Sequence, residues 1–272
     1  MFFVSLLVAG LFVGLLSSFL GIGGGSIIVP VLTLVFHIPI HVAIATSLIS
    51  VVFASSNASA EYIKKGIPNL KIGLLLETIT VIFAILGGLL SVSIKEKYLF
   101  ISFGIILFIT AYFYVRNIIS KNNTNSIKNN NKGYFSGSYY DESLNNHVFY
   151  TPDRLFLTTL VSSIAGFLSG MLGIGGGVFK VPAMNLISKI PIKVATTTSN
   201  FMMSLTAAVA SIVYLKTNLI NPVIAGLVVS GVFLGSNIGV KYFPKIKDDK
   251  IKLMFTIFLI LVGVQMFLRG LK

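Results

Sequence analysis

The pentapeptide GIGGG occurs twice in the chain, in FLGIGGGSIIVP at residues 19–30 and in MLGIGGGVFKVP at residues 171–182. Each copy lies inside an apolar run, 2–36 or 154–188, that is too long for one crossing, because about 20 apolar residues span a bilayer. Glycine disfavours a helix by about 1 kcal/mol relative to alanine and readily adopts positive φ. We therefore expect each run to break at GIGGG and a second helix to begin near Ser26 or Val178, with Pro30 or Pro182 close to its first turn.

The composition is typical of an integral membrane protein. The 272 residues are 55% hydrophobic and 11% charged, and the first charged side chain is Glu61, whereas soluble domains carry roughly 25% charged residues. A cleaved signal peptide is an alternative for the N-terminal run, but no Lys or Arg precedes the run and an internal copy follows it. The net charge of +13 comes from basic residues between apolar segments. Such residues set the orientation of a membrane protein and contact anionic lipid headgroups, so the charge does not indicate binding to nucleic acid. We expect the cell membrane as the location.

The two GIGGG segments belong to an internal duplication. At an offset of 152 residues, 19 of the 34 positions from Gly14 to Ser47 are identical, and beyond Tyr62 and Tyr214 the copies diverge in a way that calls for a small insertion. The predicted organisation is a first transmembrane repeat (1–119), a polar linker (120–153) and a second transmembrane repeat (154–272). The Asn-rich linker is expected to be exposed, cytoplasmic and at least partly disordered; docking of a partner is the other interpretation.

Three further apolar segments follow each broken one. They lie near 42–60, 70–94 and 98–116, and near 194–215, 220–240 and 251–268. Backbone polar groups in lipid must be hydrogen-bonded within the chain, which predicts helices. The predicted fold is an all-α polytopic membrane protein of about eight hydrophobic segments in two homologous four-segment repeats, with a broken or re-entrant first helix in each.

The distribution of Lys and Arg separates two topologies. If each first segment crosses the membrane once, the basic residues outside it divide 11 to 9 between the two sides; if each returns to its own side, they divide 15 to 5. The positive-inside rule favours the second arrangement, with the linker cytoplasmic and both termini outside. An odd number of crossings per half then makes the two halves inverted repeats.

The breaks are candidate anion sites. A helix that begins inside the membrane directs backbone N–H groups and the positive end of its dipole at a neighbouring ligand, and glycine permits close approach. Two such breaks would converge near the midplane, as in many secondary transporters. The alternative is that the glycines only allow helices to pack closely.

Lys180 and Glu77 are the ionisable side chains inside predicted spans. An intramembrane Lys costs on the order of 3 kcal/mol, so Lys180, whose repeat counterpart is Ile28, is expected to face a partner, a cavity or a substrate; reaching a nearby interface is the alternative. Glu77 either takes up protons for coupling, neutralises Lys180, or lies near the interface beside Lys71. The pairs Thr46/Thr198 and Ser47/Ser199 either bond neighbouring helices or line a substrate path.

The sequence contains no motif that supports an enzymatic activity or a bound cofactor. The dinucleotide pattern GxGxxG fails because the sixth positions are Ser26 and Val178, and no phosphate-binding GxxxxGK[ST] loop is present. We find no metal-ligand spacing and no nucleophile with a base. No enzyme activity, cofactor or metal is expected.

Two repeats that each carry LGIGGG followed by VP, then IP and ATS or TTS, resemble the TauE/SafE family of sulfite exporter-like membrane permeases. The resemblance covers both halves and implies a transporter of about eight hydrophobic segments that moves sulfite, sulfonates or related small sulfur-containing anions, driven by an ion gradient. The expected substrate-binding residues are Gly21, Gly23, Gly24, Gly25, Ser26, Thr46, Ser47, Gly173, Gly175, Gly176, Gly177, Lys180, Thr198, Ser199 and Asn200, with Glu77 as the coupling residue.

These observations predict a secondary transporter with alternating access. A small oxyanion would lie between the two GIGGG breaks, and rocking of the inverted halves would expose it to each side in turn. A passive anion channel and a non-transporting membrane scaffold that recruits a partner through the linker are the alternatives. The expected partners are the anion, membrane lipid and a second copy in a homo-oligomer, and not nucleic acid.

Overall fold

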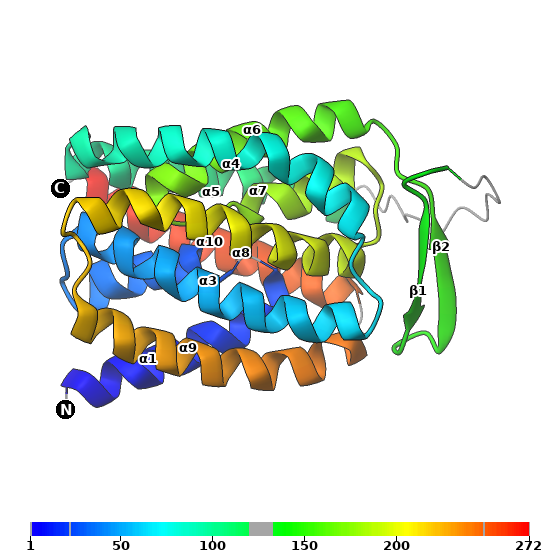
Figure 1. Ribbon diagram of the computed structural model, residues 1–272, viewed down its shortest axis with the longest axis horizontal. Helices are drawn as coiled ribbons and strands as arrows, with labels where there is room; N and C mark the ends of the chain where they lie inside the picture. The colour runs from blue at the N-terminus through cyan, green and yellow to red at the C-terminus, as the bar shows by residue number, and fades with distance from the viewer. Residues whose placement is uncertain (1, 22, 120–132, 247, 272) are drawn as a thin grey trace.

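The computed structural model describes residues 2–21, 23–119, 133–246 and 248–271. The fold is a helical bundle with one small hairpin at its end (Figure 1). The helices of the first half are α1 (Phe2–Leu20), α2 (Gly25–Pro30), α3 (Ile40–Lys64), α4 (Leu70–Ser93) and α5 (Glu96–Ile119), and α2 continues as the π-helical turn η1 (Val31–Val35). In the second half they are α6 (Leu155–Leu172), α7 (Gly177–Pro182), the π-helical turn η2 (Ala183–Ile187), α8 (Ile192–Lys216), α9 (Pro222–Tyr242), the short 3-10 helix η3 (Phe243–Lys245) and α10 (Asp248–Leu271).

The offset of 152 residues relates equivalent helices along the whole length of the two halves. It relates the bounds of α3 to those of α8 and the bounds of α5 to those of α10. It also relates Asn69 to Asn221, and each of these side chains accepts backbone N–H groups at the start of its helix, α4 or α9. The small insertion expected after Tyr62 and Tyr214 is therefore wrong, because the copies diverge there in sequence and not in length.

Each GIGGG segment ends one helix and begins another. Gly21, Gly23 and Gly24 have φ of 64°, 68° and 82°, a region that glycine adopts without steric cost. The corresponding glycines at 173, 175 and 176 have φ of 69°, 74° and 79°. Directly after Pro30 and Pro182 the helices widen into the turns η1 and η2, because proline lacks the N–H that an α-helix needs at that position. Ile22 lies outside the described residues.

Each broken segment folds back to the end of the bundle where it began. The rings of Phe2 and Phe36, at the two ends of the first segment, lie 5.6 Å apart. In the second segment the hydroxyls of Thr158 and Ser188 are 2.6 Å apart. α1 begins at the end that holds both chain termini, and α6 begins at the opposite end (Figure 1). The two segments therefore enter the bundle from opposite ends and return, as the charge count favoured over a single crossing.

The most extensive helix contacts pair helices from the two halves. α1 packs on α9, α4 on α6, α5 on α10, and α3 on α8. Glycines allow the close approach: a Cβ on Gly87 would lie 1.9 Å from the carbonyl oxygen of Phe167, and one on Gly235 would lie 2.0 Å from that of Leu11. Among the described residues, α3, α4, α6, α8 and α9 are long and apolar enough to span a membrane. The eight-segment membrane arrangement stays a prediction.

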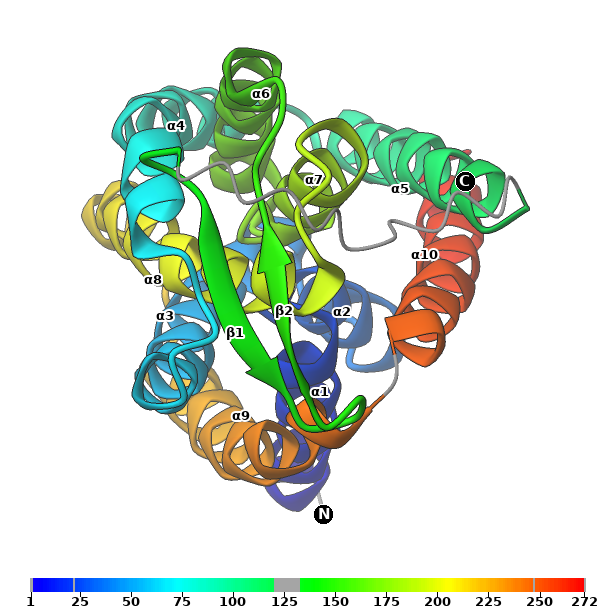
Figure 2. The same ribbon diagram turned by 90° about the vertical axis from the view of Figure 1, so that its right-hand side faces the viewer.

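Part of the linker forms a β-hairpin that the sequence analysis did not predict. Strands β1 (Gly137–Asp141) and β2 (Asn146–Tyr150) pair antiparallel, with Gly137 opposite Tyr150 and Asp141 opposite Asn146. The hairpin lies across the end of the bundle opposite the chain termini (Figure 2). We call residues 137–150 the linker hairpin. The expectation of disorder falls partly on residues 120–132, which lie outside the described residues.

Candidate functional site

The two glycine breaks, residues 21–25 and 173–177, touch each other inside the bundle. A Cβ on Gly25 would lie 2.2 Å from the carbonyl oxygen of Gly173, so only glycine fits there. Ser47 of α3 donates a hydrogen bond of 2.7 Å to that same carbonyl, and its repeat counterpart Ser199 of α8 donates one of 3.1 Å to the carbonyl of Gly21. Each serine therefore holds the break of the opposite half. The breaks converge as expected, and Ser47 and Ser199 bind backbone in this structure.

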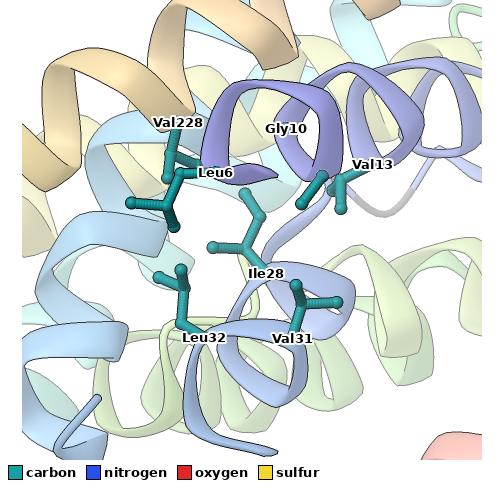
Figure 3. Close-up of a pocket in the computed structure, with 8 residues that line it drawn as sticks. Leu6, Gly10, Val13, Ile28, Val31, Leu32 and Val228 are labelled. Carbon is teal, nitrogen blue, oxygen red and sulfur yellow. The ribbon is translucent and has the colours of Figure 1, made fainter. Parts of the chain in front are cut away.

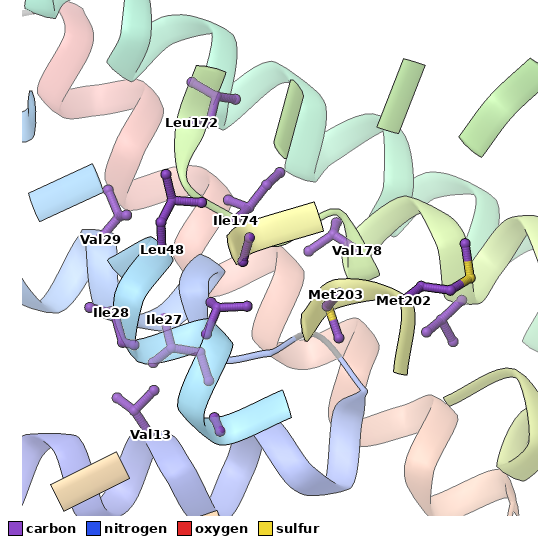
Figure 4. Packing of buried hydrophobic residues seen from close by; sticks show 14 of the residues in the cluster. Val13, Ile27, Ile28, Val29, Leu48, Leu172, Ile174, Val178, Met202 and Met203 are labelled. Atoms are coloured by element: carbon purple, nitrogen blue, oxygen red, sulfur yellow. The ribbon is translucent and has the colours of Figure 1, made fainter. Parts of the chain in front are cut away.

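Apolar side chains surround the junction of the breaks. Figure 4 shows Ile27 and Leu48 from the first half close to Ile174, Val178 and Met203 from the second, and all five are buried. They leave the junction closely packed. The expected position of an oxyanion between the two breaks is therefore closed in this structure, and a ligand would need the halves to move apart.

The charged side chains of the bundle meet beside the second break. Lys180 of α7 donates hydrogen bonds of 2.9 Å to Glu77 Oε2 and 2.7 Å to Thr206 Oγ1, and the Thr206 hydroxyl lies within hydrogen-bond distance of Glu77 Oε1 as well. The side chains of Lys180 and Glu77 are 0% and 4% exposed. We call Glu77, Lys180 and Thr206 the charged cluster. Its members come from α4, α7 and α8, so it joins the first half to the second.

This placement bears on the alternatives for the two ionisable groups. Both side chains are enclosed by protein, and Glu77 pairs with Lys180, which is one of the three alternatives for that carboxylate. The depth of the pair in the membrane stays a prediction. A Cβ on Gly176 would lie 3.3 Å from Lys180 Cε, which puts the lysine stem against the second break. A buried ion pair is costly to desolvate and contributes little net stability over an apolar pair. The pair is therefore a candidate for a functional role in addition to folding.

The equivalent position of the first half is apolar. At the offset of 152 residues, Lys180, Glu77 and Thr206 correspond to Ile28, Val229 and Ala54. Ile28 there borders a cavity of about 10 Å³ together with Leu6, Gly10, Val13, Leu32 and Val228 (Figure 3). A space of that size is at the lower limit for one water and has apolar walls. The duplicated scaffold therefore carries charge at only one of its two equivalent positions.

Several buried hydroxyl and amide groups near the breaks have no hydrogen-bond partner among the described residues. Three of them were expected in the site, namely Ser26, Thr46 and Asn200, and the further ones include Ser55, Ser169 and Thr196. A Cβ on Gly21 would lie 2.5 Å from Thr196 Cγ2, and one on Gly23 would lie 3.0 Å from Ser55 Oγ. Buried polar groups without a partner are rare and costly. These groups are available to a polar ligand or to water.

Other predicted residues have structural partners. The Thr198 hydroxyl accepts a 2.9 Å hydrogen bond from the backbone N–H of Asn69, which fixes the start of α4 against α8. Thr206, which the sequence analysis missed, gave no signal beyond its apolar counterpart Ala54. Within the described residues no group of three His, Cys, Asp or Glu could hold a metal ion.

Comparisons with known proteins agree on a membrane family. The sequence profile described as "Sulfite exporter TauE/SafE" matches residues 6–266. The probable membrane transporter protein YunE of Bacillus subtilis is 29% identical over 278 residues, which cover 100% of this chain and 99% of that protein. The probable membrane transporter protein MJ0441 of Methanocaldococcus jannaschii is 28% identical, with 97% and 94% covered. No solved structure matches the chain.

Proposed function

The chain belongs to the sulfite exporter TauE/SafE family, and from that premise we propose that it carries small sulfur-containing oxyanions such as sulfite or a sulfonate across the cell membrane by alternating access. That it is an integral membrane protein with a transport function follows from the family and from the names of its relatives. The substrate class, the coupling and the site residues are the proposal.

The charged cluster is the observation that carries the proposal. The buried cation Lys180 lies beside a glycine break, held by a carboxylate and a hydroxyl from two other helices. An oxyanion offers the same acceptor atoms as the Glu77 carboxylate, so it can replace Glu77 on Lys180 without leaving the lysine unpaired. Thr206 and the unpartnered side chains of Ser26, Thr46 and Asn200 supply further donors.

Glu77 gives the exchange a route to proton coupling. When Glu77 takes up a proton it becomes neutral and releases Lys180, which then binds the anion. Return of the anion to water lets Glu77 lose its proton and pair with Lys180 again. One proton thus accompanies one anion. In this cycle, movement of one half against the other opens the closely packed junction of the breaks to the anion.

Charge at the two ends of the bundle supports the inverted-repeat topology. Lys65 and Lys193 contact the linker hairpin, and Lys71 contacts the carbonyl of Tyr134 just before it, so all three lysines lie at the hairpin end. The opposite end holds both termini, with His41 and Glu96 3.8 Å apart. The positive-inside rule makes the hairpin end cytoplasmic. Residues 1–119 and 154–272 are then two repeats of opposite orientation.

Flux of radiolabelled sulfite into proteoliposomes tests the function. We expect saturable uptake that follows an imposed proton gradient and that an excess of unlabelled sulfonate reduces; Lys180→Met should weaken it. A passive anion channel would give uptake that does not saturate and that an imposed proton gradient cannot drive against the anion's own gradient. Absence of flux for sulfite, sulfate and a small sulfonate would contradict the proposed substrate class.

A further inference from the structure

The linker hairpin covers the bundle at the start of α8. Figure 2 shows both strands crossing the end of the bundle over its centre. Asn69 donates hydrogen bonds of 3.0 Å to the Phe135 carbonyl and 3.1 Å to the Tyr150 hydroxyl, which holds the base of the hairpin. Near the tip, Glu142 lies 3.6 Å from Lys65. The hairpin is therefore fixed to the bundle at both ends.

The innermost contact of the hairpin is an ion pair. Lys193 of α8 donates hydrogen bonds of 2.6 Å to Asp141 Oδ1 and 2.8 Å to Ser143 Oγ. Both charged side chains are 1% exposed. The remaining oxygen, Asp141 Oδ2, accepts a 3.0 Å hydrogen bond from the Tyr139 hydroxyl. Lys193, Ser143 and Tyr139 thus surround the Asp141 carboxylate, in a site built by the hairpin and the first turn of α8.

Lys193 lies in the first turn of α8, the helix that also carries Thr196 and Ser199. Three residues further along α8, Thr196 packs on Gly21 of the first break, and Ser199 binds the Gly21 carbonyl. The repeat counterpart of Lys193 is His41, whose Nε2 lies 3.2 Å from each of the carbonyl oxygens of Ser91 and Ile94. At the other end of the bundle the equivalent position thus carries a histidine, which contacts these backbone carbonyls and lies 3.8 Å from Glu96, and not a lysine.

We infer that Lys193 is an anion-binding residue at the hairpin-end entrance of the substrate path, and that the Asp141 carboxylate occupies this residue as an internal competitor of the transported anion. The inference rests on the proposed function. A carboxylate and a sulfite both present negatively charged oxygens to an ammonium group, so they exclude each other from Lys193. Because Asp141 is tethered, it competes at an effective concentration in the millimolar range.

The contacts of the hairpin argue against a purely structural role for the pair. The Glu142–Lys65 pair is partly exposed and the Asn69 contacts are neutral hydrogen bonds, and they hold the tip and the base of the hairpin. The buried pair is the contact that an anion in solution can replace, and its net contribution is its attraction less the cost of its desolvation. The two roles predict opposite effects of neutralising Asp141: loss of a structural bond would reduce transport, whereas loss of a competitor would increase it at low substrate.

Kinetics of sulfite uptake in proteoliposomes test the inference. Asp141→Asn keeps the shape and removes the charge, and Glu142→Gln is the matched control in the same turn. Apparent KM rises by the reciprocal of the fraction of molecules with a free site, so we expect Asp141→Asn to lower KM by about threefold or more without lowering kcat. Glu142→Gln removes only a partly exposed, weak ion pair, so it should lower KM much less than Asp141→Asn does. If the wild type transports sulfite but Asp141→Asn has an unchanged or higher KM, the inference is overturned and the proposed function is not.

A second measurement needs no transport. Hydrogen exchange of the hairpin amides from Tyr139 to Val148 should increase saturably as sulfite is added to the purified wild-type protein, because sulfite displaces Asp141. In Lys193→Met the amides should exchange fast without sulfite and respond no further. Absence of a sulfite response in the wild type, or the same response in Lys193→Met, would overturn the inference, whereas missing flux with a normal exchange response would contradict only the proposed function.

Discussion

At the scale of single residues, Lys180 is the side chain on which the proposed transport mechanism depends. Its ammonium group is fully buried and has Glu77 and Thr206 as its partners. In the other half, isoleucine fills the equivalent place. An apolar cluster would fold at least as well as this one, which is why we propose that the charges serve to bind an anion.

Removing one charge should destabilise the protein more than removing both. Lys180→Met leaves the Glu77 carboxylate buried without its cation, which costs about 3–5 kcal/mol. The double variant Glu77→Gln/Lys180→Met removes both charges and should recover most of the loss. Thermal unfolding in detergent gives the comparison. A double variant that is as unstable as the single one would contradict this description of the cluster.

The sequence singled out Lys180 and Glu77 because a charge in an apolar run is costly enough to need a reason. Thr206 gave no such signal. Its hydroxyl also lies 3.1 Å from the Met202 carbonyl, the ordinary partner of a threonine in a membrane helix. Nothing local distinguishes a threonine that contacts a lysine from one that bonds only its own helix. Lys193 and Asp141 were missed because their pairing depends on where a linker segment docks.

At the scale of elements, the glycine breaks let two chain segments meet inside the bundle. Their existence and position could be predicted, since four glycines in five residues cannot continue a helix in lipid. The linker hairpin could not, because a five-residue strand pair is marginal alone. Its stability comes from packing, with Tyr139 and Tyr150 buried at the bundle end.

Alanine at the junction of the breaks should be far more damaging than alanine elsewhere in the helices. Gly25→Ala places a methyl group 2.2 Å from the Gly173 carbonyl oxygen, whereas Gly226→Ala in α9 meets nothing within 4 Å. We expect Gly25→Ala to destabilise the protein by about 1–3 kcal/mol or more and Gly226→Ala to stabilise it by about 0.5–1 kcal/mol. Unfolding temperatures of the two variants measure the difference. Equal temperatures would mean that the breaks do not touch.

Docking of the linker hairpin should depend on pH through Asp141. Burial alone would raise the pKa of Asp141, but hydrogen bonds from Lys193 and Ser143 outweigh it and hold the pKa below its usual value. A lowered pKa in the docked state means that docking is favoured above the unperturbed pKa of about 3.9 and is lost as pH falls through the docked pKa. A fluorine label on Leu144→Cys should report release below pH 4. Asp141→Asn should abolish that transition; if it persists unchanged, another group controls docking.

At the scale of the whole molecule, the chain is two halves that enter the bundle from opposite ends. The duplication and its offset could be read from the sequence, and so could the end at which the basic loops gather. The sequence could not show that the two copies keep equal length beyond Tyr62, because apolar residues on lipid-facing helices can replace one another. Only the helix bounds and the paired caps at Asn69 and Asn221 reveal it.

Membrane orientation is testable by labelling, since the chain contains no cysteine. Lys97→Cys lies at the end that holds the termini, and Leu144→Cys lies at the tip of the linker hairpin; both side chains are exposed. The positive-inside rule predicts that a membrane-impermeant maleimide labels Lys97→Cys in intact cells and Leu144→Cys only after lysis. The reverse pattern would place the hairpin outside.

Sulfite flux through the variant that lacks both Lys180 and Glu77 is the best test of the proposed mechanism. Wild type, Gly226→Ala as a reconstitution control, and the double variant Glu77→Gln/Lys180→Met are compared in the same proteoliposomes under one proton gradient. The proposed mechanism predicts saturable uptake by the wild type and by Gly226→Ala, and none above background by the double variant. The unfolding temperature of the double variant shows whether it is folded. Uptake by a folded double variant at the wild-type rate would show that Lys180 and Glu77 neither bind the anion nor couple its movement to protons.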